Sequence, residues 1–272
     1  MTFLFNYNKA GAGVAKGGPK KKPFFKFWEL FARKFWKFFC INALYLIFCL
    51  PIVTFGPATA AMTQLMRKFV LEKPIFIWHD FWDAFKKNFR QSVGVGIADV
   101  LFIGCFGFAM YYYDNLLNMD SGMQNMILMA VTVATAAFVF MMHFYIYLQI
   151  VSLNLSVSAI IKNSMKLVVI GLKNNIITLI VCVAIITVFV LFYPYSMLVL
   201  PLIPFAWMSF VIVFNSYPVI TKAIINPYYE SRGERNPELP SEDENEEAVF
   251  EDMGGKEEPV KVKTKAHGKI IH

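Results

Sequence analysis

Formal charge is almost absent from the long apolar runs of this sequence. The runs cover residues 93–113, 126–151, 176–193 and 196–220, and Asp99 is the only formally charged residue within them. A helix needs ~20 apolar residues to cross the ~30 Å hydrocarbon core of a bilayer. Each run reaches or approaches that length, which argues against a soluble globular domain. The sequence predicts an all-α polytopic membrane protein.

The common motifs of catalytic, metal and nucleotide sites are also lacking. The sequence contains no HExxH, GxSxG or GxxxxGK[ST] pattern, and no apolar run holds a second carboxylate that could pair with Asp99. Four cysteines lie in apolar runs without CxxC spacing or a neighbouring His cluster, which favours free thiols over zinc or a disulfide: Cys40, Cys49, Cys105 and Cys182. We therefore expect no enzyme, no metal and no cofactor.

We expect no N-terminal targeting signal either. The first long apolar run starts near residue 38, behind a basic leader, and no clean small-x-small cleavage site follows it. Thr2 takes the place of the glycine that N-myristoylation requires. We expect the protein to be held in the membrane by its own helices.

What the sequence has in excess is apolar residues and, over most of its length, positive charge. Of 272 residues 57% are hydrophobic and 17% are charged, and the mean hydropathy is +0.50. The net charge is +12 over residues 1–222 and −5 over residues 223–272. Because the cations flank apolar runs and aromatic residues, we expect anionic lipid headgroups as their partner, and no nucleic acid. The predicted lipid-interface residues are Arg33, Lys34, Lys37, Arg67, Lys68, Lys86, Lys87 and Arg90.

Amphipathic stretches precede several apolar runs. After a flexible, basic, Gly-rich arm at 1–22, five aromatic residues from Phe24 to Phe38 recur at helical spacing, with charged residues on another face. Similar stretches cover 75–91 and, in a milder form, 155–173. Such helices suit the headgroup layer, although for the first one an ordinary aromatic packing face is the alternative.

The first membrane segment, about 38–56, ends in a predicted helix break at Pro51, Gly56 and Pro57. A short helix rich in small residues is expected at 57–71, where Pro57 suits the first helical position. Each arm of this helical hairpin is shorter than a full span, so the second arm is expected to be short or re-entrant.

The membrane domain is expected to cover residues 23–222, with both chain ends in the cytoplasm. Basic segments before residue 38, at 63–92 and at 155–173 favour the cytoplasmic side, whereas the 114–125 loop has no Lys or Arg. The hairpin keeps the first two basic segments on one side. A five-span protein with the leader outside is the alternative.

The last span, 196–220, contains Pro201 and Pro204 and is expected to kink. Beyond it, residues 223–272 form an acidic and then basic tail that is expected to be disordered. The alternative for the tail is a docking segment for a basic partner or for the protein's own basic surface.

Three polar residues within or near the spans are the candidate functional residues: Asp99, Asn42 and His143. An intramembrane carboxylate indicates ion coupling or contact with a substrate, and a histidine can relay protons. The structural alternatives are pairing of Asp99 with Asn42, Arg67 or a helix end, and a helix-packing hydrogen bond for His143.

Residues 22–90 resemble the YesL-like family of bacterial membrane proteins, a family of unknown function. The resemblance lies in the basic, aromatic lead, the segment LPIVTFGPATAA, the Arg67-Lys68 pair and the segment FWDAFKKNF. It implies a five- or six-segment helical protein of the bacterial cell membrane, and it brings no ligand residues. Genes of the family often neighbour carbohydrate ABC transporter genes, which implies an accessory or regulatory partner of such a transporter. A small-solute transporter in its own right is the alternative, and a lipid-sensing protein is a third hypothesis.

Overall fold

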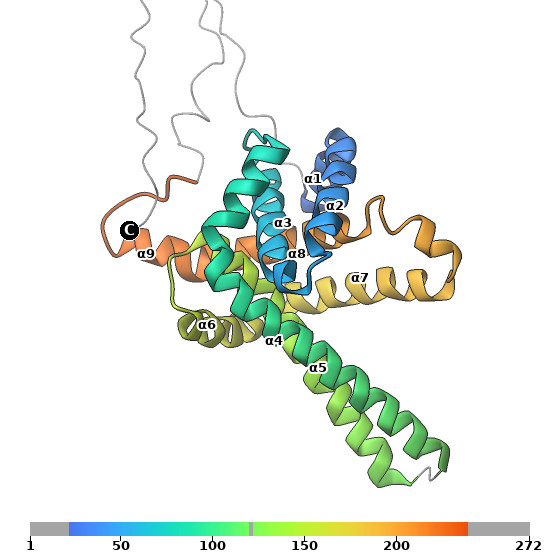
Figure 1. Cartoon of the computed structure of the whole chain (residues 1–272). Helices are drawn as coiled ribbons and strands as arrows, with labels where there is room; N and C mark the ends of the chain where they lie inside the picture. The colour runs from blue at the N-terminus through green and yellow to red at the C-terminus, as the bar shows by residue number, and fades with distance from the viewer. Residues whose placement is uncertain (1–21, 120–121, 239–272) are drawn as a thin grey trace, which may run out of the picture.

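The computed structural model describes residues 22–119 and 122–238, and within these residues it consists of helices and connecting turns without a strand. An all-α fold is therefore confirmed (Figure 1). The helices are α1 Pro23–Arg33, α2 Phe35–Cys49, α3 Phe55–Val70, α4 Ile77–Met119, α5 Met123–Ser152, α6 Val157–Ile170, α7 Leu172–Leu191, α8 Pro204–Ile220 and α9 Asn226–Glu230. Over residues 22–119 and 122–238, four segments are long and apolar enough to cross a membrane: α4, α5, α7 and the stretch Pro204–Glu230.

Helices α2 and α3 form the expected hairpin around a break at Pro51. Between them lies a 3₁₀ turn, Ile52–Thr54, in which the Thr54 hydroxyl contacts the Phe48 and Pro51 carbonyl oxygens at 2.5 and 2.7 Å. Helix α3 begins at Phe55, two residues before the predicted start at Pro57. At 15 and 16 residues the two helices are ~22–24 Å long, shorter than a full span.

Helix α3 is the centre of the bundle, and its contact with α4 is unusually close. Gly56 and Gly96 face each other: a Cβ added to Gly96 would lie 2.6 Å from the Gly56 Cα. A Cβ on Gly56 would lie 2.0 Å from the Ser92 carbonyl oxygen. Small residues allow such an approach between membrane helices. Further along α3, Leu65, Met66 and other residues are fully buried against the neighbouring helices.

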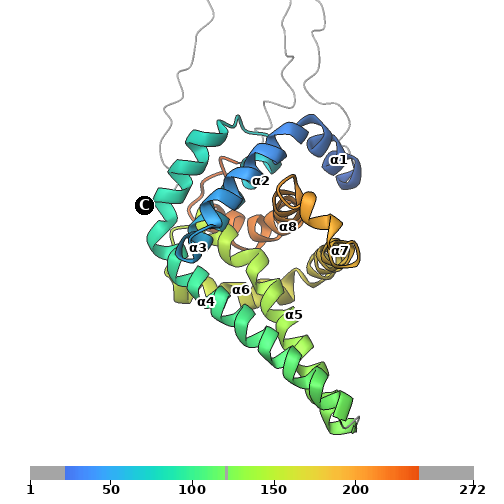
Figure 2. The ribbon, with the colours of Figure 1, turned by 45° about the vertical axis from the view of Figure 1, so that its right-hand side comes forward.

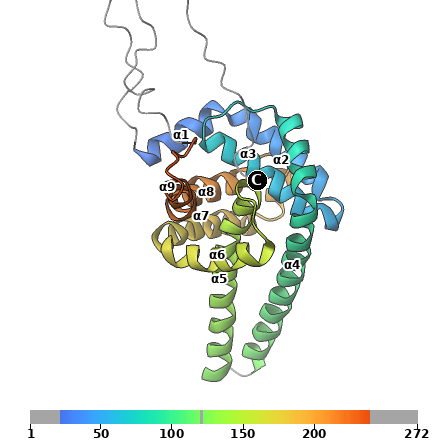
Figure 3. The same ribbon diagram turned by 90° about the vertical axis from the view of Figure 1, so that its left-hand side faces the viewer.

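The structure corrects the prediction around residues 75–125. The amphipathic stretch at 75–91 and the apolar run at 93–113 are one helix, the 43-residue α4, which is ~65 Å long. Most of the expected 114–125 loop is helical, because α4 continues to Met119 and α5 begins at Met123. Beyond the bundle, α4 and α5 continue side by side as a two-helix arm, seen from three directions in Figures 1, 2 and 3.

The aromatic residues of the amphipathic stretches are divided between the interior and the surface. In the first stretch, the helix breaks at Lys34 between α1 and α2; Phe38 is fully buried, whereas Phe24 is 67% exposed. At the start of α4, Phe81 and Phe85 are buried and their rings lie 5.3 and 5.1 Å from that of Phe48 in α2. Of the five aromatic residues of the first stretch only Phe38 is buried, whereas Phe24, Trp28 and Phe35 are exposed, so a packing face covers only part of that stretch.

The end of the membrane domain differs from the prediction at two places. The last long helix begins at Pro204 and not at 196, because the preceding segment forms turns that include a 3₁₀ helix, Tyr195–Leu198. The expected disordered tail does not start at 223: residues 221–225 form a π-helical turn, α9 follows, and Asn236 is only 4% exposed. The predictions of a flexible arm over 1–21 and of a disordered tail over 239–272 lie outside the described residues.

Candidate functional site

A cavity of about 220 Å³ lies within the helical bundle, between α2, α3, α4, α5 and α8. Most of its lining is apolar, from residues such as Phe55, Phe140 and Ile212. Its titratable side chains are Asp99 and three residues from α2 and α5: Tyr45, His143 and Tyr147. The structure thus brings two of the three predicted polar residues, Asp99 and His143, to one cavity.

Asp99 is held by two side chains of α5. Its Oδ1 lies 2.5 Å from His143 Nε2, and its Oδ2 accepts a hydrogen bond of 2.5 Å from the Tyr147 hydroxyl. Asp99 and Tyr147 are 7% and 5% exposed, so the contacts are sheltered from solvent. The partner of Asp99 is therefore His143, and neither Asn42 nor Arg67 bonds to it.

The hydrogen-bond geometry fixes the number of protons that Asp99 and His143 share. His143 Nδ1 lies 2.7 Å from the Val139 carbonyl oxygen, which only accepts, so Nδ1 carries a hydrogen. The contact between Nε2 and Oδ1 then holds one proton, on the imidazole or on the carboxyl group. In both arrangements the pair is neutral overall, and a neutral pair is the form that an apolar environment tolerates best.

The local sequence explains how these side chains meet. His143 and Tyr147 are four residues apart on α5 and so lie on the same face of that helix. Tyr147 was not among the residues predicted from the sequence, although its spacing from His143 is a signal that could have identified it. Asp99 lies three residues after Gly96, where α4 is pressed against α3. The α3–α4 contact therefore sets the position of the carboxylate.

A second hydrogen-bonded pair lies on the α2 and α3 side of the cavity. Thr59 has one hydroxyl hydrogen, which it donates to the Phe55 carbonyl oxygen at 2.8 Å. The Tyr45 hydroxyl, 3.3 Å from Thr59 Oγ1, is therefore the donor in that contact. The cavity thus combines apolar walls with a few polar groups from different helices, the usual composition of a small-ligand site.

Asn42, the third candidate, lies elsewhere and has a structural role. Its Oδ1 accepts hydrogen bonds from the backbone N–H groups of Phe205 and Ala206, at 3.0 and 3.1 Å. Its Nδ2 donates to the Leu200 carbonyl oxygen at 3.1 Å. Asn42 therefore caps the N-terminus of α8 from another helix, where the first N–H groups have no partner within α8. The prediction that Gly56 and Pro57 belong to the helix break is wrong, because both lie buried in the first turn of α3, and the break is confined to Pro51 and the turn Ile52–Thr54.

Several of the predicted lipid-interface cations have partners within the protein. Arg33 pairs with Glu72, Arg67 with Glu238 and Lys68 with Asp80, at 2.9, 2.5 and 2.9 Å. The hydrogen bond from Arg33 outweighs partial burial and lowers the pKa of Glu72, which favours its charged form. The ammonium groups of Lys34 and Lys86 lie over aromatic rings, and Lys37, Lys87 and Arg90 are exposed.

No group of three or more His, Cys, Asp or Glu residues capable of holding a metal is found among the described residues. The four cysteines are free thiols.

The comparisons with known proteins give one result. Residues 38–112 match the family described as "Protein of unknown function, DUF624". Neither a curated protein nor a solved structure matches the chain. The matched segment contains Asn42, Gly56, Gly96 and Asp99, whereas His143 lies beyond it. The match over residues 38–112 agrees with the resemblance of this segment to the YesL-like family of bacterial membrane proteins, which that description denotes.

Proposed function

We propose that this protein is a non-enzymatic accessory or regulatory partner of a carbohydrate ABC transporter. The gene neighbourhood implied by the family resemblance supports this choice of partner. The observation that carries the proposal is the arm formed by α4 and α5, which extends beyond the bundle (Figure 3) and whose two helices are apolar enough to cross a membrane. The proposed occupants of the arm's outer face are transmembrane helices of the permease.

Two glycines on the outer face of the arm support this partner over lipid alone. A Cβ added to Gly104 or Gly107 would meet nothing within 4 Å, so the fold of this chain does not require either glycine. Glycine lowers helix propensity by about 1 kcal/mol relative to alanine. Lipid chains pack against leucine as well as against glycine, whereas a partner helix gains close backbone contact at small residues.

Crosslinked affinity purification from native membranes, read by mass spectrometry, tests this proposal. We expect sugar-permease subunits to copurify with the wild type and to be lost with Gly104→Leu and Gly107→Leu. The matched control is Ala184→Leu, which adds similar volume at an exposed position of α7. Recovery of the protein alone, or only as an oligomer, would overturn the accessory role.

A second function, transport of a small solute, is supported by the cavity beside Asp99. Its volume of about 220 Å³ lies below the ~300–1,000 Å³ of sites for drug-sized ligands, so a small solute fits it better than an oligosaccharide. Proteoliposomes that contain only this protein provide the assay. Uptake that collapses with Asp99→Asn but persists with Asp114→Asn, an exposed carboxylate of the same helix, would favour transport. Equal uptake by both variants would count against it.

We further propose that both chain ends face the cytoplasm and that Lys37, Lys87 and Arg90 contact anionic lipid headgroups. The basic segments around α1 and the start of α4 support this orientation. Labelling of single cysteines placed near residues 73 and 115 with a membrane-impermeant reagent tests it. Labelling at 115 in intact cells, and at 73 only after lysis, is expected; the reverse pattern would refute the orientation.

A further inference from the structure

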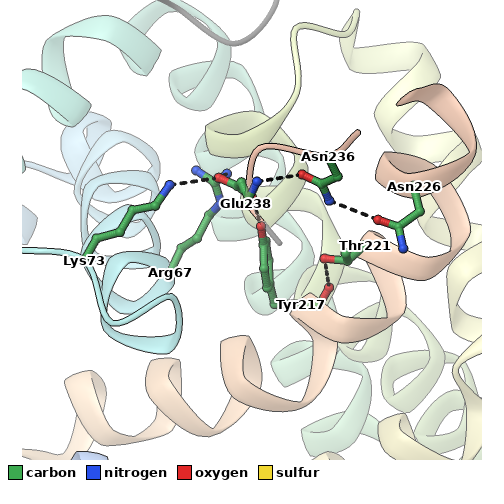
Figure 4. A network of polar contacts seen from close by, with 7 residues as sticks. All are labelled: Arg67, Lys73, Tyr217, Thr221, Asn226, Asn236 and Glu238. Carbon is green, nitrogen blue, oxygen red and sulfur yellow. Dashed lines mark hydrogen bonds and ion pairs between the residues drawn. The ribbon is translucent and has the colours of Figure 1, made fainter. Parts of the chain in front are cut away.

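Glu238 occupies a site formed by three donors from separate parts of the chain (Figure 4). Its Oε1 lies 2.5 Å from Arg67 Nη2 of α3 and 3.3 Å from Lys73 Nζ, which follows α3. Its Oε2 accepts a hydrogen bond from the Tyr217 hydroxyl of α8. The Glu238 side chain is 6% exposed, so both oxygens are bound in a largely enclosed site.

The segment that delivers Glu238 to this site is lightly attached. After α9 the chain turns at Gly233, whose φ of 66° lies in the left-handed region that favours glycine. Asn236 then links Glu238 to Asn226. Its Oδ1 accepts a hydrogen bond of 2.9 Å from the Glu238 backbone N–H, and its Nδ2 donates one of 2.9 Å to Asn226 Oδ1. Between residues 231 and 238, Asn236 is the only residue classed as buried. Apart from Asn236 and the enclosed Glu238 side chain, this segment buries little surface, which lowers the free-energy cost of its opening.

Glu238 leaves part of the binding capacity of the site unused. Arg67 Nε is buried and has no hydrogen-bond partner among the described residues, although a guanidinium group presents five N–H donors. Glu238 contacts Arg67 only at Nη2, since its second oxygen is taken by Tyr217. Two cations, Arg67 and Lys73, face a single carboxylate. The N–H donors and the positive charge of the site therefore suit an anion that has more oxygens and a higher negative charge than a carboxylate.

The site also adjoins space for a larger ligand. A cavity of about 240 Å³ extends from Arg67 and Glu238 toward Ser152, Asn154 and Tyr228. Within the part of the chain that the structure describes, the Ser152 hydroxyl is buried without a hydrogen-bond partner. Unsatisfied polar groups beside a cavity are costly unless a ligand or water binds there.

We propose that Arg67, Lys73 and Tyr217 form a phosphate-binding site, which Glu238 occupies internally and from which a phosphate-bearing ligand displaces it. A phosphate monoester carries a charge of about −1.5 to −2 and offers three acceptor oxygens. It can engage Arg67 at two nitrogens and still bind Lys73 and Tyr217. The phosphate comes from a soluble monoester or from the headgroup of an anionic lipid. This site is independent of the proposed transporter partnership.

Two assays on the full-length protein distinguish these sources. In the first, protein in phosphatidylcholine nanodiscs is titrated with inorganic phosphate by calorimetry. In the second, native mass spectrometry counts phosphatidic acid molecules retained from mixed micelles. Binding in the first assay identifies a soluble phosphate, and retention in the second assay alone identifies a lipid headgroup.

Three variants test the role of the named residues. Glu238→Gln removes the charged competitor, so we expect phosphate to bind about tenfold more tightly, whereas Arg67→Gln weakens binding at least tenfold. Lys68→Gln is the matched control, because Lys68 is the next residue of α3 and pairs with Asp80 outside the site. If Arg67→Gln does not fold, Tyr217→Phe, which removes one donor, replaces it. The proposal is wrong if neither phosphate nor phosphatidic acid binds to Glu238→Gln. It is also wrong if Arg67→Gln binds these probes as well as Lys68→Gln does. Where Tyr217→Phe replaces Arg67→Gln, the same comparison applies to it.

Discussion

Replacing Gly96 with alanine tests the central contact of the fold, the approach of α3 to α4. The new Cβ would lie 2.6 Å from the Cα and N atoms of Gly56, whereas ordinary contacts are 3.4–4 Å. The helices must therefore separate by roughly 1 Å at this point. Overpacking of this kind costs about 1–3 kcal/mol, and we expect the upper part of this range because both partners are backbone atoms.

Thermal unfolding in detergent, followed by the loss of the folded-protein peak in size-exclusion chromatography, measures the effect. A loss of about 2–3 kcal/mol corresponds to a fall in Tm of about 4–12 °C for a chain of this size. Gly94→Ala is the matched control, because a Cβ at Gly94 meets nothing within 4 Å and alanine favours the helix. Equal melting temperatures for Gly96→Ala and Gly94→Ala would refute the close contact.

Three further predictions use the same unfolding assay. Asn42→Leu leaves the first N–H groups of α8 unpaired, and we expect a loss of about 2 kcal/mol or more; an unchanged Tm would disprove the capping role. Glu72→Gln breaks exposed ion pairs, so a loss below about 1 kcal/mol that vanishes at high salt is expected, and a larger loss would contradict this. Burial by itself raises the pKa of Glu238, but Arg67 and the hydrogen bond from Tyr217 outweigh it and hold this pKa below the ordinary 4.5. The stabilisation by Glu238 is therefore complete when the pH is above the pKa that this carboxyl has in the unfolded chain, and it is lost as the pH falls through the lower pKa of the folded protein. Wild type and Glu238→Gln should accordingly differ in Tm at pH 7 and converge in acid.

The sequence predicted the helical class and the break at Pro51, because apolar length and proline act locally. It did not predict that α4 is continuous from Ile77 to Met119. The polar stretch that joins its two parts is helical, and its buried side chains Asn88 and Ser92 are satisfied within the helix, since they donate hydrogen bonds to carbonyl oxygens one turn earlier. A change in hydropathy therefore marked a change of environment and not a helix end.

The site was predicted only in part, because its contacts join residues that are distant in sequence. Asp99 and His143 were each identified as polar residues within an apolar run, but the partners expected for Asp99 were Asn42, Arg67 or a helix end. The pairing itself spans 44 residues and depends on how α4 and α5 pack. Similarly, the acidic composition after residue 227 concealed Glu238, whose contact with Arg67 spans 171 residues.

The fold and the cavity are coupled through one turn of α4. Gly96 lies against α3, and Asp99, one turn later, meets His143 and Tyr147 on α5, so a shift of α4 away from α3 also moves the carboxylate. Asp99→Asn, in contrast, changes the cavity and leaves the α3–α4 contact intact. If the cavity binds a solute, we expect both Gly96→Ala and Asp99→Asn to impair uptake, but only Gly96→Ala to lower the Tm through helix separation. Uptake retained by Gly96→Ala despite a lowered Tm would show that the position of Asp99 does not depend on α3.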